Sequence, residues 1–340
     1  MSHESKALLR ASKRYARENR WLSWWHLGSA LVLFAALIVA ACLHALPWPV
    51  RVLSSVIAGM MIVRLFIVYH DYQHGTILQG SSLAAGLMTA YGLVTLNPPS
   101  IWNRSHNYHH KHNAKMYGTA IGSYPLMTVA SYWAATPRER FMYRVSRHAI
   151  TIALGYVTIF LYGMCIRSLG INPRLHFDSA LAIFVHAAVI AVALIFGDWS
   201  VVVLAVLLPS TIAAATGAYF FYAQHNCPGL KLRDRAEWDY TWAALQSSSF
   251  IRMGRIMHWF TGNIGYHHVH HLNAHIPFYR LPEAMAGIPA LQSPVTTSLS
   301  LRDIWRCLHL KLWDPTRDRL VTFESNTYRV AGECYHPPAP

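Results

Sequence analysis

Long apolar stretches separated by short polar and basic ones occupy the first two thirds of the chain. Four of these stretches are long enough to cross a bilayer core about 30 Å thick: residues 27–46, 50–69, 178–196 and 199–223. Two others, 83–96 and 149–166, do not fit a crossing. The first is only about fourteen residues long, and the second has arginines near both ends. The pattern predicts four transmembrane helices and two in-plane or re-entrant segments.

The polar stretches divide the chain into three regions. Residues 1–25 combine six Lys or Arg with three tryptophans, which predicts a basic interfacial N-terminal helix. Residues 26–226 form the transmembrane region, and residues 227–340 form a polar C-terminal region. Because Lys and Arg gather on the cytoplasmic side of membranes, both termini are expected there. We expect a mainly α integral membrane protein with a helical cytoplasmic cap, in the cell inner membrane if the chain is bacterial.

The composition is typical of a membrane protein and argues against several other classes of protein. The chain is 54% hydrophobic and only 13% charged, about half the usual charged fraction of a soluble domain, and its mean hydropathy is +0.23. Its net charge of +14 suits anionic membrane lipid or an acidic protein partner. It contains no basic run with a nucleic-acid motif, so no nucleic-acid partner is expected. The five cysteines are scattered, without a CxxC pair, which argues against a zinc knuckle and a disulfide framework.

Histidines are the most informative residues of the sequence. Eleven of the 21 fall in three windows, 70–74, 106–112 and 267–275. The first window reads HxxxH and the other two contain HxxHH, and positions i, i+3 and i+4 of a helix lie on one side of it. The isolated histidines are read as surface or interface groups: His3, His26, His148, His176, His258, His309 and His336.

The number of clustered imidazoles constrains the metal. Neutral imidazole is the commonest metal ligand. HxxxH plus two HxxHH motifs supplies eight nitrogens, too many for one tetrahedral zinc. Two five- or six-coordinate ions fit better, and imidazole suits iron as well as zinc or copper. The sequence therefore predicts a di-metal site of histidines held in the cytoplasmic cap.

Four segments resemble a known family. HDYQH, HNYHH and GNIGYHHVHHLNAHIPFYRLPE look like the three histidine boxes of membrane fatty acid desaturases, the stand-alone bacterial type in particular. FYAQHN is similar to the Gln-His element that precedes the C-terminal region in that family, and the likeness covers residues 60–285. The resemblance implies nine metal ligands: His70, His74, His106, His109, His110, His225, His267, His270 and His271.

Neighbouring residues are assigned by the same comparison. Animal acyl-CoA desaturases carry an asparagine four residues before the equivalent of His225, where this chain has Phe221, so the resemblance leaves open whether a tenth ligand exists. His268 falls outside the ligand pattern and is expected beside the ligands. Asp71 is placed to orient an imidazole by accepting the N–H of the ring nitrogen that does not bind the metal. No catalytic residue beyond the ligands is expected.

The resemblance also implies an activity. It implies O2-dependent desaturation of a fatty acyl chain, as acyl-lipid or acyl-thioester, by a non-haem centre of two iron ions (Fe2+/Fe3+). The chain has no flavin or dinucleotide fingerprint, so electrons are expected from an external ferredoxin or cytochrome b5-type donor. The alternative is a di-iron hydroxylase or ketolase acting on an alkane, sterol or carotenoid. A metal transporter is disfavoured because the boxes lie at span ends, not at mid-span.

Overall fold

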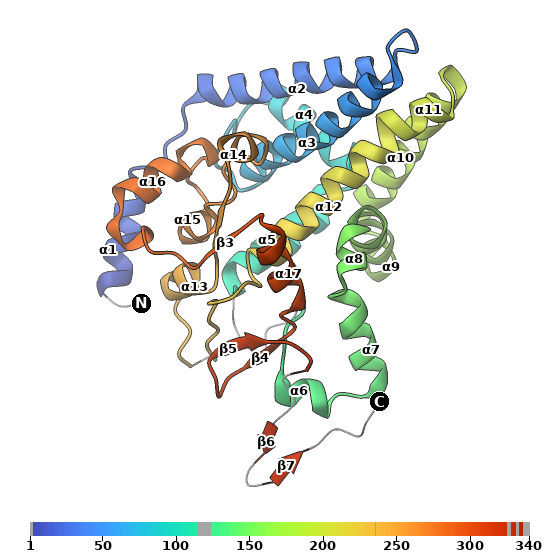
Figure 1. Cartoon of the computed structure of the whole chain (residues 1–340). Helices are drawn as coiled ribbons and strands as arrows, with labels where there is room; N and C mark the ends of the chain where they lie inside the picture. Colours follow the sequence, from blue (N-terminus) through green and yellow to red (C-terminus); the bar gives the residue numbers. More distant parts are fainter. Residues whose placement is uncertain (1–2, 114–123, 235, 325–327, 331–332, 336–340) are drawn as a thin grey trace.

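The computed structural model describes residues 3–113, 124–234, 236–324, 328–330 and 333–335, and these are mostly helical (Figure 1). Within these described ranges, four helical stretches are long and apolar enough to cross a membrane, which confirms the prediction from the sequence: α2 (Arg20–Cys42), α3 (Trp48–Gln73), α10 (Phe177–Phe196), and the continuous run of α11 (Trp199–Val202), η2 (Val203–Leu207) and α12 (Leu208–Ala223).

Helix α3 is the central span. It packs against both α2 and α12, and 61% of its most apolar window is buried, against 17% for α2. The contact with α12 is close at Gly59, where an added Cβ would lie 2.9 Å from the Ile212 side chain and from the Pro209 carbonyl oxygen. Pro47 and Pro49 begin the helix, and Gly75, with φ of +70°, follows its last turn. Of these features, Gly75 ends α3 directly after the first histidine motif, while Gly59 sets its packing against α12.

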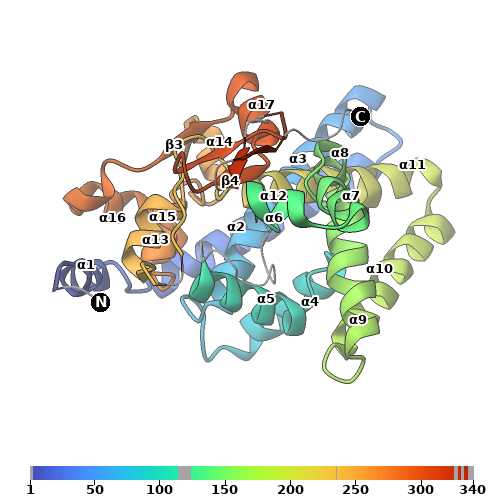
Figure 2. The same ribbon diagram turned by 90° about the horizontal axis from the view of Figure 1, so that it is seen from below.

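The two apolar stretches that were predicted not to cross form shorter helices. The first is α4 (Ser82–Val94), which is capped by the Ser81 side chain and packs against α10. The second is divided into α8 (Ala149–Ala153), η1 (Tyr156–Arg167) and α9 (Ser168–Ile171). Seen along the direction of Figure 2, this segment runs across the direction of α10 and α12. The apolar helices within the two stretches, Ser82–Val94 and Tyr156–Ile171, are each only 10–17 residues long.

Helix α5 (Pro99–His112) follows α4 and carries the second histidine motif. The connection turns sharply at Leu96, whose φ is +58°, and the Tyr69 hydroxyl of α3 donates to the Asn97 carbonyl oxygen at 2.8 Å. Pro98 and Pro99 then begin α5. The end of α3 and the start of α5 are therefore tied together.

The remaining elements form a cap around one end of the spans. Its helices are α1 (His3–Lys13), α6 (Val129–Ala134), α7 (Pro137–Ser146), α13 (Tyr240–Gln246), α14 (Arg255–Phe260), α15 (His267–Leu272), η3 (Phe278–Arg280), α16 (Leu281–Gly287), η4 (Pro289–Leu291) and α17 (Leu301–His309). Its strands are β1 (Met127–Thr128), β2 (Phe250–Arg252), β3 (Thr296–Ser298), β4 (Leu312–Asp314), β5 (Arg319–Val321), β6 (Tyr328–Val330) and β7 (Glu333–Tyr335).

Strand pairing links distant parts of the cap. Strand β1 pairs in parallel with β4, which pairs antiparallel with β5, while β2 and β3 form a second, parallel pair and β6 and β7 an antiparallel one. The basic N-terminal segment is divided in two: α1 ends at Lys13 and contacts α13, and the tryptophans belong to the start of α2. Figure 1 shows α1 beside α16, at the edge of the cap.

Candidate metal centre

Four separate parts of the chain bring histidines to one place in the cap. His70 and His74 come from the last turn of α3, and His225 follows the end of α12. The other motifs lie on the short helices α5 and α15. The nine predicted ligands all lie in two adjoining groups. The structure therefore gathers every histidine that the sequence comparison selected.

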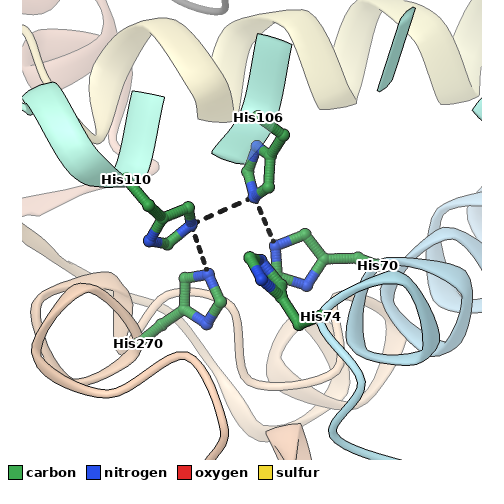
Figure 3. A group of neighbouring side chains, drawn as sticks. All are labelled: His70, His74, His106, His110 and His270. Atoms are coloured by element: carbon green, nitrogen blue, oxygen red, sulfur yellow. Dashed lines mark hydrogen bonds between the residues drawn. The ribbon is translucent and has the colours of Figure 1, made fainter. Parts of the chain in front are cut away.

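The first group contains five imidazoles: His70, His74, His106, His110 and His270. One nitrogen from each lies within 4.8 Å of every other, and Figure 3 shows the rings pointing toward a common centre. The Nε2 atom of His106 lies 3.1 Å from that of His70 and 3.1 Å from that of His110. His110 and His270 are also separated by 3.1 Å between Nε2 atoms. This convergence is the geometry of a ligand set around a small cation.

The second group contains four imidazoles arranged as a closed ring: His109, His225, His267 and His271. The Nε2 of His109 lies 3.0 Å from that of His225 and 3.2 Å from that of His271. The Nε2 of His267 closes the ring at 2.9 Å from His225 and 3.0 Å from His271. Two of its members come from α15, one from α5, and His225 from the segment that follows α12.

Helices α5 and α15 contribute to both groups. In each, the histidines four residues apart share a group, as His106 with His110 and His267 with His271. The histidine at i+3 faces the other group, which places His109 in the second and His270 in the first. Adjacent helical residues differ by about 100° in direction. These two helices therefore form the boundary between the groups, and the rings of His110 and His271 stack across it at 4.3 Å.

Hydrogen bonds to the outer nitrogens set the direction of two rings. His70 Nδ1 donates to Asp71 Oδ1 (3.1 Å), as the sequence predicted for Asp71. Asp71 Oδ2 also accepts the backbone N–H of Phe278 (2.7 Å), which links the first motif to the segment after the third. His225 Nδ1 donates to the Ser247 carbonyl oxygen (2.9 Å). In both histidines Nε2 is left with a lone pair that faces the group.

Counting protons shows that these residues fit a metal ion. Because His225 carries its proton on Nδ1, the other three imidazoles of the ring offer at most three Nε2–H donors. The ring has four close Nε2 contacts. Each N–H can serve only one contact, so at least one contact has no hydrogen bond, whereas a cation at the centre of the ring would accept a lone pair from all four Nε2 atoms.

Burial keeps these imidazoles in their metal-binding form. It lowers the pKa of His225 from 6.5 to about 4. It also lowers the pKa of the other ligand candidates outside the spans well below 6.5, with neighbouring imidazoles adding to the effect: His74, His106, His109, His110, His267, His270 and His271. At neutral pH they are uncharged, the state in which imidazole binds metal.

His268 and Phe221 lie beside the groups and belong to neither. His268 is fully buried and its Nε2 donates to the Leu291 carbonyl oxygen (3.1 Å), which ties α15 to η4. The ring of Phe221 lies 5.2 Å from that of His109 and 6.4 Å from that of His225. A phenyl ring offers no metal ligand. Among the described residues, the second group therefore has four ligand nitrogens, all from histidine.

Comparison with known proteins agrees with the geometry. The model of the family described as fatty acid desaturase matches residues 46–295, which include all nine clustered histidines. The chain belongs to the fatty acid desaturase family. The desaturase is also 28% identical over 328 residues to a protein of Bacillus subtilis (strain 168) named fatty acid desaturase, which covers 96% of this chain and 92% of that protein. The present chain is therefore a membrane oxidoreductase that desaturates fatty acids, and its family is metal-dependent.

The desaturase also holds α5 in place through residues that the sequence did not single out. Ser100, at the start of α5, donates through its backbone N–H to Asp178 Oδ2 (2.8 Å) and through Oγ to Asp178 Oδ1 (2.6 Å). His176 Nδ1 lies 2.8 Å from Ser100 Oγ. The prediction that His176 is a surface or interface group was wrong, since it is only 2% exposed. A lone carboxylate at the start of the apolar run 178–196 was the available signal, because such a charge requires a partner.

Proposed function

We propose that the two histidine groups each hold one iron ion and that together they form the oxidising centre of the desaturase. The division of nine imidazoles into five and four carries this proposal. Two irons would supply, with O2, the oxidising power that removal of two hydrogens from an unactivated methylene chain requires. All-nitrogen sets of this number fit iron better than tetrahedral zinc. The substrate proposed is a fatty acyl chain as acyl-lipid or acyl-thioester.

The protein's own groups prepare the site. Burial keeps the imidazoles neutral, and Asp71 and the Ser247 carbonyl hold two of them with Nε2 directed inward. Placing the histidines on the ends of α3 and α12 connects the site to the membrane-spanning part, where an apolar acyl chain is soluble. The chain therefore supplies fixed ligands and an apolar surrounding, which together position one part of the substrate.

Expression in a host that lacks the activity tests the proposed reaction. Mass spectrometry of total fatty acids should reveal a new monoene or diene in cells with the native chain, and none with His267→Ala. Hydroxylated or ketonic products would favour the hydroxylase or ketolase alternative, which the comparisons do not support. Identical lipids in both strains would contradict either activity.

Replacing Asp71 with asparagine should weaken the first group without removing a ligand. The amide of asparagine has one acceptor oxygen in place of two, so its NH2 group faces either the His70 Nδ1–H or the Phe278 N–H, and one of the two hydrogen bonds is lost. Loss of such an orienting carboxylate typically lowers metal affinity about 10–100-fold. Titration of the bound metal with a chelator should show this shift, whereas Glu237→Gln, an exposed carboxylate-to-amide change, should leave the titration unchanged. Equal titration curves for the two variants would contradict the role of Asp71.

We further propose a cytoplasmic location for both termini and the histidine groups, with 1–25, 26–226 and 227–340 as the N-terminal, transmembrane and cytoplasmic regions. The basic residues of the N-terminal segment, among them the exposed Lys6, Arg10 and Lys13 of α1, support this orientation. Green fluorescent protein fused to the C-terminus should fluoresce, and a fused alkaline phosphatase should be inactive. The reverse pattern would contradict it.

Electrons are proposed to come from an acidic ferredoxin or cytochrome b5-type protein. The net charge of +14 favours attraction of such a donor to the cap. Turnover supported by purified ferredoxin should fall as ionic strength rises from about 0.01 M to 0.5 M, where the Debye length shortens several-fold. Turnover driven by a small uncharged reductant serves as the control and should change little. A salt-independent rate with ferredoxin would contradict charge-steered docking.

A further inference from the structure

Two helices of the C-terminal region expose large apolar side chains. On α14, Ile256 is 73% exposed and Trp259 is 43% exposed. On α17, Leu301 is 86% exposed and Trp305 is 59% exposed. We call these four side chains the α14–α17 surface. A water-exposed face of this composition is unusual for a cytoplasmic region.

Helix α14 lies level with the membrane-spanning helices. Arg64, inside the α3 span, donates to the carbonyl oxygen of Trp259, and its guanidinium stacks 4.1 Å from the indole. The same guanidinium lies 3.0 Å from Nδ1 of His26 on α2, beside Trp25, which is 68% exposed. Arg64 is nine residues, or about 14 Å, from the end of α3. Because α3 is about 39 Å long and a bilayer core about 30 Å thick, a centred core places Arg64 about 9 Å inside its cap-side edge.

Helix α17 adjoins both α14 and the membrane part. Leu308 packs with Ile152 of α8 and with Ala218 and Tyr222 of α12. Cys307, on its buried face, belongs to the same apolar cluster as Met257 of α14. The exposed apolar face of α17 is thus continuous with surfaces that lipid already covers.

The spacing on α17 is that of an interfacial helix. Leu301, Ile304, Trp305 and Leu308 follow the i, i+3, i+4, i+7 pattern of a single apolar side. Four exposed arginines flank the α14–α17 surface: Arg252, Arg255, Arg302 and Arg306. The acidic residue of α17, Asp303, is engaged by the Ser298 hydroxyl. Apolar and tryptophan side chains bordered by arginine match the acyl and headgroup layers of an anionic leaflet.

We propose that α14 and α17 insert into the headgroup layer of the leaflet on the cap side, with the arginines contacting anionic lipid phosphates. The C-terminal region is then a lipid-embedded cap, and the third histidine motif, which directly follows α14, lies at the membrane surface. A docked protein is the other occupant such a face could take. Trp259 contacts Arg64 inside the α3 span, at a depth in the bilayer that a soluble partner protein could not reach. This position favours lipid as the occupant.

Spin labels on the full chain test the insertion independently of metal content and activity. Leu301→Cys and, separately, Trp305→Cys are labelled in a Cys42→Ser, Cys334→Ser background and placed in nanodiscs of phosphatidylcholine with phosphatidylglycerol. Glu237→Cys, an exposed site of the same region away from the α14–α17 surface, is the water-exposed control. Collisions with O2 should exceed those with an aqueous nickel chelate at 301 and 305, corresponding to a depth of about 5–10 Å.

The outcomes separate the two parts of the proposal. Water-like accessibility at both 301 and 305, equal to that at 237, would overturn insertion and leave a protein partner as the occupant. A shallower position in pure phosphatidylcholine would support the contact between the arginines and anionic lipid. Identical depths in the two lipid mixtures would overturn that contact while supporting insertion of the apolar face.

Discussion

His109→Ala is expected to abolish desaturation and to remove one metal ion from each chain. His109 is one of only four imidazoles in the second group, and its Nε2 contacts both His225 and His271. Three imidazoles would remain, and the hole left by the fourth would be open to water in place of a fixed ligand. Activity should fall about a thousandfold or more, as for residues that act as one unit. Fatty acid analysis and elemental analysis of the purified variant measure the two effects.

Two neighbours on the same helix provide matched comparisons. His112→Ala should keep both metals and activity, because its ring stacks on Tyr108 and belongs to neither group. His110→Ala takes one imidazole from the five-histidine group, and the four that remain should still bind a metal ion. Full activity in His109→Ala, or equal loss in His109→Ala and His112→Ala, would contradict the assignment of ligands along α5.

His267→Ala and His268→Ala should separate metal binding from stability in adjacent residues. His267 belongs to the second group, so its loss should abolish activity and release metal. His268 is equally buried but bonds the Leu291 carbonyl oxygen. Removing it leaves that acceptor unsatisfied, a cost of about 1–3 kcal/mol in the free energy of unfolding. Thermal unfolding in detergent and metal analysis of each variant distinguish the two roles.

One result for this pair of variants would contradict the assignment of His267 and His268. If His268→Ala lost metal as completely as His267→Ala while remaining folded, His268 would be a ligand and the groups would be wrongly divided. His268→Gln is the conservative control, because its amide can still donate to the Leu291 carbonyl. It should recover part of the stability lost in His268→Ala.

Spacing along the chain predicted much of the site. HxxxH and HxxHH imply that residues four apart point together, and the pairs His70 with His74 and His106 with His110 do share a group. The sequence did not predict that the i+3 histidine would serve the other group. That outcome depends on how α5 and α15 pack between α3 and the end of α12, which is a tertiary property. The second contact of Asp71, to the Phe278 N–H 207 residues later, was hidden for the same reason.

The membrane layout was predictable where length decides it. A run of fourteen apolar residues cannot cross a bilayer, and α4 is indeed a short helix. The single interfacial helix expected over 1–25 is instead interrupted after Lys13, and the Asn19 side chain caps the start of α2 by accepting from the Leu22 N–H. An Asn cap is a local signal that the basic pattern around it concealed. The position of α14 beside α3 could not be predicted, because it rests on the contact between Arg64 and Trp259.

Elemental analysis of the purified, fully folded desaturase tests the central claim most directly. The chain is expressed with ample iron and zinc, purified in detergent without chelators, and measured for metal per chain by mass spectrometry. Two groups of five and four imidazoles predict about two irons per chain. One zinc per chain, or no metal in protein that still desaturates fatty acids, would contradict the account.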